Sequence, residues 1–360
     1  MVGHHWTGSN MSKDLILLAH GSGGRLSHDL VEKLFLRHFG NPVLLQLDDS
    51  AVVGIPTAQS KVSSSIDRQP RIAFSTDSYV ISPLVFPGGD IGKLAVCGTV
   101  NDLSMSGARP LWLSAGFIVE EGLPLADLEQ IVASMAITAE HAGVQIVTGD
   151  TKVVDRGSAD KLFINTAGVG LVPPGVTIAG DQAKPGDAVL LNGTIGDHGM
   201  TIMTQREGLQ FASPLESDCS PLNGLVAGLL ETLPPGSVHC LRDPTRGGLA
   251  TALNELAARS QVGIEIDETS LPVREPARAA CELLGLDPLY VANEGKLVAI
   301  VAHEAADAAL ATLRAHRYGR EATIVGHVTE THPGRVVLRT ALGARRIVDM
   351  LVGEQLPRIC

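Results

Sequence analysis

The sequence is poor in aromatic residues, which make up only 3% of its 360 positions. Its hydrophobic cores must therefore be built from Val, Ile, Leu and Ala. No apolar run approaches the ~18 residues that a membrane-spanning helix needs. The N-terminus also carries no basic and apolar leader. These absences predict a cytoplasmic protein that makes no contact with a membrane.

Cysteine is sparse as well, and the five cysteines form no C-x-x-C pair. This odd number and wide spacing argue against a disulfide scaffold or a structural zinc site. Basic residues are outnumbered, 28 against 39 acidic ones, so the net charge is −11. Such a charge argues against nucleic acid as a partner. A nucleotide remains compatible with it where metal ions offset nearby carboxylates.

Glycine is plentiful, with 39 residues that cluster in short loops, as backbone does where it approaches a ligand closely. A length prior of roughly 150 residues per domain predicts two domains. The break falls at Pro173-Pro174-Gly175. We therefore expect a disordered extension over residues 1–13, an N-terminal domain over 14–175, a C-terminal domain over 176–344 and a mobile tail over 345–360.

Apolar runs predict short strands over Leu44–Leu47, Ile72–Phe74 and Val144–Val147. Helical spacing predicts a helix over Leu125–Ala142, which Gly143 ends.

Six aspartates follow predicted strands or adjoin apolar helices and glycine turns, in both halves of the chain: Asp48, Asp49, Asp77, Asp102, Asp150 and Asp243. Carboxylate oxygens are the ligands that Mg²⁺ prefers. Alternative readings are a hairpin turn for Asp48-Asp49 and an exposed ion pair for Asp150 and Lys152. No P-loop or Rossmann fingerprint is present. A nucleotide site would therefore be built from scattered aspartates that hold Mg²⁺ between the two domains.

Three further positions have both a chemical and a structural interpretation. Arg246, before paired glycines and an amphipathic helix, fits an anion site at a helix start, although Asp243 beside it is also a good cap. Glu294 stands on a tight Asn-Glu-Gly-Lys loop, either as a hairpin turn or as a general base. His198 is either catalytic or a local hydrogen-bonding residue.

The chain ends in Leu356-Pro357-Arg358-Ile359-Cys360. No residue follows Cys360 to anchor its backbone, so we expect a mobile tail with an exposed sulfur. The thiol is then either a carrier or nucleophile, or simply the last residue of a frayed end. Fully extended, residues 347–360 reach about 45 Å at ~3.3 Å per residue, enough to enter a site in the body of the chain.

Together these motifs resemble the HypE family of nickel–iron hydrogenase maturation proteins. The resemblance runs from about Asp14 to Cys360, and several motifs are shared with aminoimidazole ribonucleotide (AIR) synthetase and selenophosphate synthetase. The terminal cysteine motif separates HypE from those relatives. The stretches that carry the resemblance are Ala19–Gly24, Asp48–Ala51, Ser75–Asp77, Cys97–Asp102, Thr148–Lys152, Arg242–Gly248, Asn293–Lys296 and Pro357–Cys360.

The resemblance implies a two-domain α/β (α+β) fold like that of AIR synthetase, whose N-terminal domains pair into a β barrel in a homodimer. It implies ATP and Mg²⁺ as cofactors, and a carbamoyl group received on Cys360 from the carbamoyltransferase HypF. The family dehydrates this S-carbamoyl group to a thiocyanate and passes cyanide to iron held by HypC and HypD.

The resemblance also assigns roles to residues. ATP contacts are expected from Asp49, Asp77, Asn101, Asp102, Thr148, Gly149, Asp150, Lys152, Arg246 and Gly247, and Mg²⁺ ligands are expected in Asp49, Asp77, Asp102 and Asp243. Cys360 would carry the reacting group and Lys152 would offset phosphoryl charge. Glu294 would accept a proton, with His198 as the alternative acceptor.

Two rival functions remain open from the sequence. One is a small-molecule ATP-dependent synthetase, in which Cys360 is incidental. The other is a carrier that binds nucleotide without turnover and uses the tail only for docking.

Overall fold

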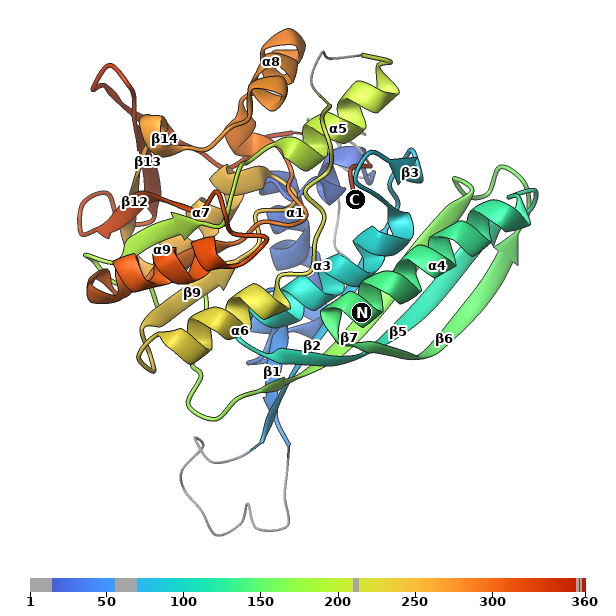
Figure 1. Ribbon diagram of the computed structural model, residues 1–360, viewed down its shortest axis with the longest axis horizontal. Coiled ribbons are helices and arrows are strands. Elements are labelled where there is room, and N and C mark those ends of the chain that lie inside the picture. The colour runs from blue at the N-terminus through green and yellow to red at the C-terminus, as the bar shows by residue number, and fades with distance from the viewer. Residues whose placement is uncertain (1–14, 56–69, 210–213, 354–355, 357) are drawn as a thin grey trace, which may run out of the picture.

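A computed structural model describes residues 15–55, 70–209, 214–353, 356 and 358–360. The extension expected over residues 1–13 lies outside this part of the chain. Figure 1 shows two α/β units side by side, one around the strands beneath α3 and α4 and one around the strands near α7 and α9. No helix among the described residues is long and apolar enough to cross a bilayer. The mixed α/β, two-unit fold predicted from the sequence is confirmed.

The N-terminal unit is a five-stranded sheet in the order β1-β2-β7-β5-β6, in which only the β5–β6 pair is parallel. Its strands are β1 (Ala51–Gly54), β2 (Arg71–Tyr79), β5 (Arg109–Glu120), β6 (Gln145–Val154) and β7 (Leu162–Val172). A small ladder joins β3 (Val85–Phe86) to β4 (Gly89–Asp90). Short helical segments precede the sheet: η2 (Leu18–Gly21), α1 (Arg25–Leu30), η3 (Val31–Phe35), α2 (Leu36–Phe39) and η4 (Leu44–Gln46).

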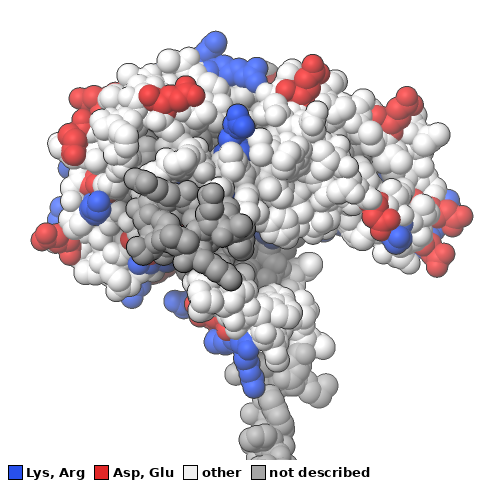
Figure 2. All heavy atoms as spheres, turned by 90° about the horizontal axis from the view of Figure 1, so that it is seen from below, with Lys and Arg blue, Asp and Glu red and all other residues white. Residues whose placement is uncertain are grey.

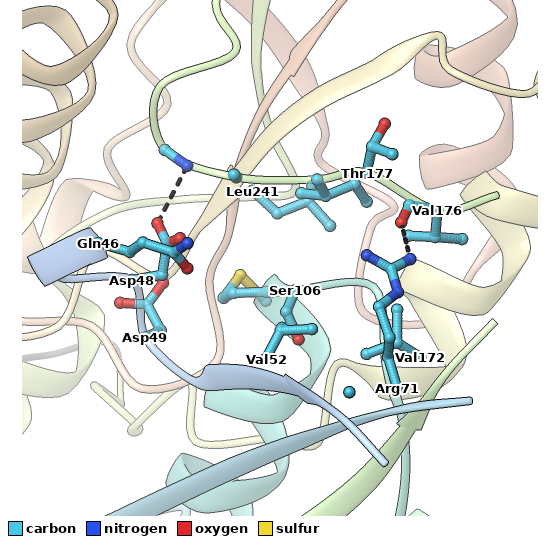
Figure 3. Close-up of a pocket in the computed structure, with 15 residues that line it drawn as sticks. Gln46, Asp48, Asp49, Val52, Arg71, Ser106, Val172, Val176, Thr177 and Leu241 are labelled. Atoms are coloured by element: carbon cyan, nitrogen blue, oxygen red, sulfur yellow. Dashed lines mark hydrogen bonds between the residues drawn. The ribbon is translucent and has the colours of Figure 1, made fainter. Parts of the chain in front are cut away.

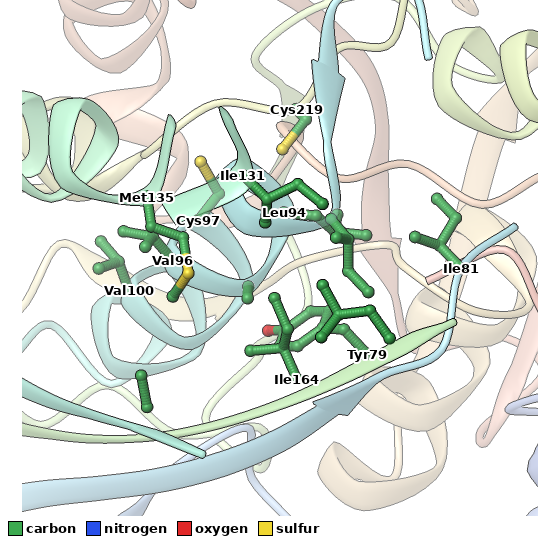
Figure 4. Close-up of a cluster of buried hydrophobic side chains, with 14 of the residues drawn as sticks. Tyr79, Ile81, Leu94, Val96, Cys97, Val100, Ile131, Met135, Ile164 and Cys219 are labelled. Carbon is green, nitrogen blue, oxygen red and sulfur yellow. The ribbon is translucent and has the colours of Figure 1, made fainter. Parts of the chain in front are cut away.

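Helices α3 (Ile91–Met105) and α4 (Leu125–Ala142) cover one face of this sheet (Figure 1). Asp90 starts α3 because its carboxylate accepts hydrogen bonds from the N–H groups of Gly92 and Lys93. Gly92 lets α3 approach α4 closely, since a Cβ there would lie 2.5 Å from the Ile131 carbonyl oxygen. Figure 4 shows the resulting core, in which Tyr79 lies beside Ile164 and below Leu94 of α3.

The C-terminal unit is a seven-stranded sheet in the order β14-β13-β10-β12-β8-β11-β9. Its strands are β8 (Ala188–Leu191), β9 (Val238–Arg242), β10 (Gly263–Asp267), β11 (Val298–Val301), β12 (Thr323–Thr329), β13 (Arg335–Arg339) and β14 (Arg345–Val348). Its helices are α5 (Asp197–Arg206), α6 (Asn223–Thr232), α7 (Gly248–Ser260), α8 (Glu275–Leu284) and α9 (Ala306–Ala315), with short 3-10 turns η6 (Glu268–Ser270), η7 (Pro288–Tyr290) and η8 (His303–Ala305).

Four local expectations were wrong. The apolar run Leu44–Leu47 is not a strand: η4 occupies Leu44–Gln46 and a left-handed residue follows it. Strand β2 does not end before Ser75 but continues through Tyr79, and Thr148–Lys152 lie inside β6 rather than beyond it. Residues 345–348 do not begin the tail, because they pair with β13 as β14. In the three strands, backbone hydrogen bonds to a neighbouring strand hold polar residues in extended form, although the same residues resemble turn residues in the sequence.

The second face of the N-terminal sheet is open and apolar. Phe74, Val169 and Trp112 lie in one row across β2, β7 and β5. Phe74 and Trp112 are 46% and 48% exposed, although both are large and hydrophobic. The view from below in Figure 2 shows few charged side chains between the charged ends of the molecule. Such an apolar face typically marks a protein contact.

Candidate functional site

A polar cavity of about 270 Å³ lies where the two units meet. We call it the acidic pocket. Residues from both units line it. They come from strand β2, helix α3, the start of α7, the glycine turn before α1, the 293–296 loop and the chain end. Its lining residues are Gly23, His28, Asp49, Ser75, Thr76, Asp77, Gly98, Asp102, Arg242, Asp243, Thr245, Arg246, Gly248, Thr251, Ala252, Glu255, Glu294 and Cys360.

Four of the predicted aspartates converge on this pocket. Burial raises the pKa of Asp102 well above its usual value, and the charges of Asp243 and Asp77 raise it further. Burial likewise raises the pKa of Asp49, and that of Asp243 to about 6, while Arg242 opposes both shifts. These groups therefore repel one another when ionised, and a bound cation would relieve that repulsion.

No three His, Cys, Asp or Glu side chains among the described residues are arranged to hold a metal by themselves. The pocket nevertheless suits Mg²⁺, which usually takes one or two carboxylates and completes its shell with phosphates and water. Asp102 accepts one hydrogen bond, from Ser75 Oγ at 2.6 Å. Its raised pKa shows that its negative charge is poorly compensated.

An ionic network joins the pocket to the N-terminal helices. Arg242 Nε lies 3.1 Å from Asp49 Oδ1, and its guanidinium also pairs with Glu255 on α7. The second oxygen of Glu255 lies 2.7 Å from Nε2 of His28 on α1. The hydrogen bond with Glu255 raises the pKa of His28. Sequence reasoning missed His28 and Glu255, because each lies inside a helix with no motif around it.

The start of α7 lines the pocket with Gly248, Thr251 and Ala252. Gly247 and Gly248 have φ angles of 76° and 61°, a region that side chains other than glycine rarely adopt. One turn later, the buried Thr251 Oγ1 has no hydrogen-bond partner. Arg246 lines the pocket, and its guanidinium donates to the Gly21 carbonyl at 3.1 Å. This combination is typical of an anion site at a helix N-terminus.

Glu294 reaches the pocket from the 293–296 loop. It is 4% exposed and its Oε1 has no hydrogen-bond partner. Burial raises its pKa well above the usual value, and neighbouring negative charges raise it further. Asn101, expected as an ATP contact, instead donates to the Glu294 carbonyl at 3.2 Å and to the Ser220 carbonyl at 3.1 Å. Asn101 thus holds the loop that carries Glu294.

The end of the chain is folded into the pocket. Cys360 is part-buried and lines the pocket with Glu294 and Arg246. Burial raises the pKa of its thiol to about 12, against the opposing charge of Arg246. The expectation of an exposed sulfur was therefore wrong, because Ile359 is buried in the core and anchors the last residue. His198, expected as an alternative proton acceptor, lies beside Ile359 and does not line the pocket.

Four expected ATP contacts lie elsewhere, on the edge strand β6: Thr148, Gly149, Asp150 and Lys152. All four are exposed. Asp150 Oδ2 and Lys152 Nζ form an ion pair at 2.9 Å, in which both side chains are 70% exposed. Within one chain these residues are not brought to the acidic pocket.

The strand register explains this separation. Asp150 is paired with Gly116, Gly116 with Asn165, and Asn165 with Ser78, so these four lie in one row. Paired residues share a face of a sheet and successive residues alternate between faces. Asp77 therefore points to the opposite face from Ser78, into the acidic pocket, while Asp150 points to the open face.

A second cavity of about 370 Å³ adjoins the acidic pocket and shares Asp49 with it. In Figure 3, Asp48 and Asp49 stand at one end and Arg71 at the other. Asp48 accepts from the Gly180 N–H at 3.0 Å and pairs with Arg259, while the Arg71 guanidinium donates to the Val176 carbonyl. Asp48, singled out in sequence, thus joins the two units and does not line the acidic pocket.

Comparison with known proteins matches the two units separately. The AIR synthase related protein N-terminal domain matches residues 47–172, and the C-terminal domain of the same description matches residues 184–339. The chain is 56% identical to the carbamoyl dehydratase HypE of Azotobacter vinelandii over 343 residues, which cover 95% of this chain and 96% of the relative.

Solved structures agree with these matches. A HypE crystal structure in complex with ATP superimposes with a TM-score of 0.78 at 53% identity, and covers 96% of this chain and 100% of its own. The structure of a HypE–HypF complex superimposes with a TM-score of 0.82 at 48% identity, covering 89% and 99%.

Proposed function

Because the chain belongs to the HypE family of AIR synthase related proteins, we propose that it is an ATP-dependent carbamoyl dehydratase that acts on an S-carbamoyl group carried by its own Cys360. One observation carries this proposal: Cys360 lies in the same pocket as the aspartates, Arg246 and Glu294. The folded body is then the enzyme, and the tail is its tethered substrate.

The proposed reaction has two steps. The carbamoyl oxygen first attacks the γ-phosphorus of ATP, which releases ADP and one N–H proton and leaves an S-bound O-phosphoimidate. Loss of the second N–H proton then expels phosphate and forms the thiocyanate. Phosphorylation is needed because an amide oxygen is a poor leaving group, and the elimination needs a base.

Glu294 is the proposed proton acceptor, because it is buried, lines the same pocket as Cys360 and has a carboxylate oxygen without a hydrogen-bond partner. Its raised pKa makes the carboxylate a stronger base than an exposed one. Arg246 and the N–H groups after Gly247 would bind phosphate. Asp49, Asp77, Asp102 and Asp243 would hold Mg²⁺, which when bound neutralises phosphate charge.

Lys152 and its neighbours on β6 would act through a second copy of the chain. The open apolar face that carries Phe74 and Trp112 supports pairing of two N-terminal sheets into a shared barrel. We propose that this homodimer supplies Thr148, Gly149, Asp150 and Lys152 to a nucleotide bound at the partner's acidic pocket. Lys152 would there offset charge on the transferred phosphoryl group.

The proposed enzyme works in the cytoplasm and receives its carbamoyl group from HypF, in line with the HypE–HypF complex among its structural relatives. It then passes cyanide to iron held by HypC and HypD, for a nickel–iron hydrogenase. A single thiol that is loaded, dehydrated and unloaded in turn would need to leave the pocket for both partners.

Intact-protein mass spectrometry tests the function. After incubation with HypF, carbamoyl phosphate and ATP, we expect wild-type protein to gain one carbamoyl group at Cys360 and then lose one water. The control is Cys360→Ala, which should gain nothing. Absence of modification in both proteins would refute the proposal and favour a small-molecule synthetase. Carbamoylation without ATP-dependent loss of water would favour a carrier.

A further inference from the structure

The last residues of the chain are held by a built binding site rather than by one contact. The Val80 N–H donates to the Cys360 backbone oxygen at 2.9 Å, and the Ser82 N–H donates to the Arg358 carbonyl at 3.4 Å. Ile359 is 3% exposed and packs into the core of the N-terminal unit. The chain end is thus fixed on both sides of Ile359.

The Arg206 guanidinium also donates to the Arg358 carbonyl. The polar contact nearest to Cys360 along the chain, apart from that of Val80, comes from His198 on α5. Its Nε2 lies 2.8 Å from the Ile359 carbonyl oxygen, and its Nδ1 lies 2.7 Å from Ser217 Oγ. A carbonyl can only accept, so Nε2 carries the proton and Nδ1 accepts from the Ser217 hydroxyl. The Ser217 oxygen in turn accepts from the Cys219 N–H at 3.1 Å.

This arrangement leaves His198 without a free nitrogen for proton transfer. The ring is fully buried, does not line the acidic pocket and packs edge-on against Phe86, with centroids 5.6 Å apart. Burial lowers the pKa of His198 and keeps the ring neutral. The ring of His198 therefore holds the Ile359 carbonyl in place, and Ile359 directly precedes Cys360.

We propose that His198 is a positioning residue which, together with Ser217, holds the Ile359 carbonyl and thereby fixes the Cys360 sulfur in the acidic pocket. This inference rests on the proposed function for its consequence in catalysis. The docking step itself does not depend on that function, because it concerns only the free thiol and the folded chain.

The alkylation rate of Cys360 by iodoacetamide in the full-length protein measures docking directly. Peptide mapping separates Cys360 from buried Cys240, which serves as an internal control for unfolding. His198→Leu removes the donor, and we expect Cys360 to react about tenfold faster while Cys240 is unchanged. His198→Gln keeps an N–H donor near Nε2, so its rate should stay within about threefold of wild type.

Dehydration of S-carbamoyl protein on addition of ATP separates positioning from catalysis. We expect His198→Leu to lose water slowly and His198→Gln to recover most of the wild-type rate, since glutamine donates but is no base. If His198→Gln protects Cys360 yet dehydrates as slowly as His198→Leu, His198 is the base and the proposal is overturned. Unchanged Cys360 alkylation in His198→Leu would overturn it as well.

Ser217→Ala provides a smaller change in case His198→Leu does not fold. It removes the partner of Nδ1 and the acceptor of the Cys219 N–H, and we expect Cys360 alkylation to rise severalfold with Cys240 unchanged. An alkylation rate equal to wild type would contradict the Ser217–His198 support. If wild-type protein never loses water, the proposed function fails, while the alkylation series still decides whether His198 docks the tail.

Discussion

Glu294 is the residue on which the proposed elimination depends most directly. Gln is nearly isosteric but cannot accept a proton, so we expect Glu294→Gln to slow dehydration by about 100-fold while carbamoylation at Cys360 is unchanged. Accumulation of the carbamoylated mass after ATP addition measures this. Glu129→Gln, at an exposed position on α4, is the matched control. Full activity in Glu294→Gln would remove the assignment of Glu294 as the base.

Asp243 makes the stability of the free protein depend on pH. Its folded pKa of about 6 lies above the usual 3.8 because it is buried. The folded state therefore binds the proton more tightly than the unfolded state does. The stabilisation is complete below about pH 4 and is lost as pH rises through 6.

We therefore expect Asp243→Asn to reduce the pH dependence of stability, although Asp49, Asp102 and Glu294 still contribute to it. We also expect it to stabilise the nucleotide-free protein by about 1–3 kcal/mol at pH 8. Thermal melts at pH 5 and pH 8, without Mg²⁺ or ATP, test it. Asp127→Asn, at an exposed position on α4, should melt as wild type does at both values. A wild-type pH dependence retained in Asp243→Asn would contradict the role of Asp243.

At the residue scale, the sequence predicted candidate site residues, and the structure shows which of them lie together. Asp77, Asp102, Asp243 and Glu294 meet in one pocket, as polar residues beside strands and glycine turns had indicated. Thr251 and His28 were missed, because the features that matter, a free hydroxyl and a distant carboxylate partner, exist only after folding.

At the scale of elements, the start of α7 needs glycine for two separate reasons. Gly248 has φ +61°, and a Cβ there would lie 2.5 Å from the Leu289 carbonyl oxygen. Gly285, which ends α8, has a similar φ of +68° but no neighbour within 4 Å. A side chain at Gly285 would meet only backbone strain, whereas a side chain at Gly248 would meet both backbone strain and a steric clash.

We expect Gly285→Ala to lower the free energy of unfolding by about 1 kcal/mol. Gly248→Ala should lower it by at least twice as much, because only there must neighbouring backbone atoms move. Gly248→Ala should also weaken ATP binding, since the N–H groups that face the pocket move. Chemical denaturation and titration with ATP measure the two effects. Equal costs at the two positions would show that the start of α7 adapts without strain.

The periodicity of apolar residues predicted helices well and strands less well. Helix α4 was expected over Leu125–Ala142 and has those bounds, with Gly143 as its left-handed cap. Strand β2 was cut short at Phe74, because Ser75–Ser78 are polar residues that a ladder with β7 keeps in strand form. Pairing between distant strands decides such segments, and sequence alone does not contain it.

At the scale of the whole molecule, the two-unit division was predictable from length and from Pro173-Pro174-Gly175, which lies between the two matched family segments. The separation of Lys152 from the acidic pocket could not be predicted from the sequence, because it depends on strand register. An exposed edge strand beside an open apolar face is compatible with pairing to another chain. In the homodimer that we propose, such pairing would bring the β6 residues to the partner's pocket.

Subunit mixing tests this route. Lys152→Ala and Asp243→Asn copies should each be inactive alone. If Lys152 acts on the partner's pocket, a mixed dimer rebuilds one intact site of two, so an equimolar mixture should regain about a quarter of wild-type dehydration after random exchange. The matched control combines Asp102→Asn with Asp243→Asn, two changes on the same side of every site, and should stay inactive. Recovery in neither mixture would mean that Lys152 does not act across the dimer.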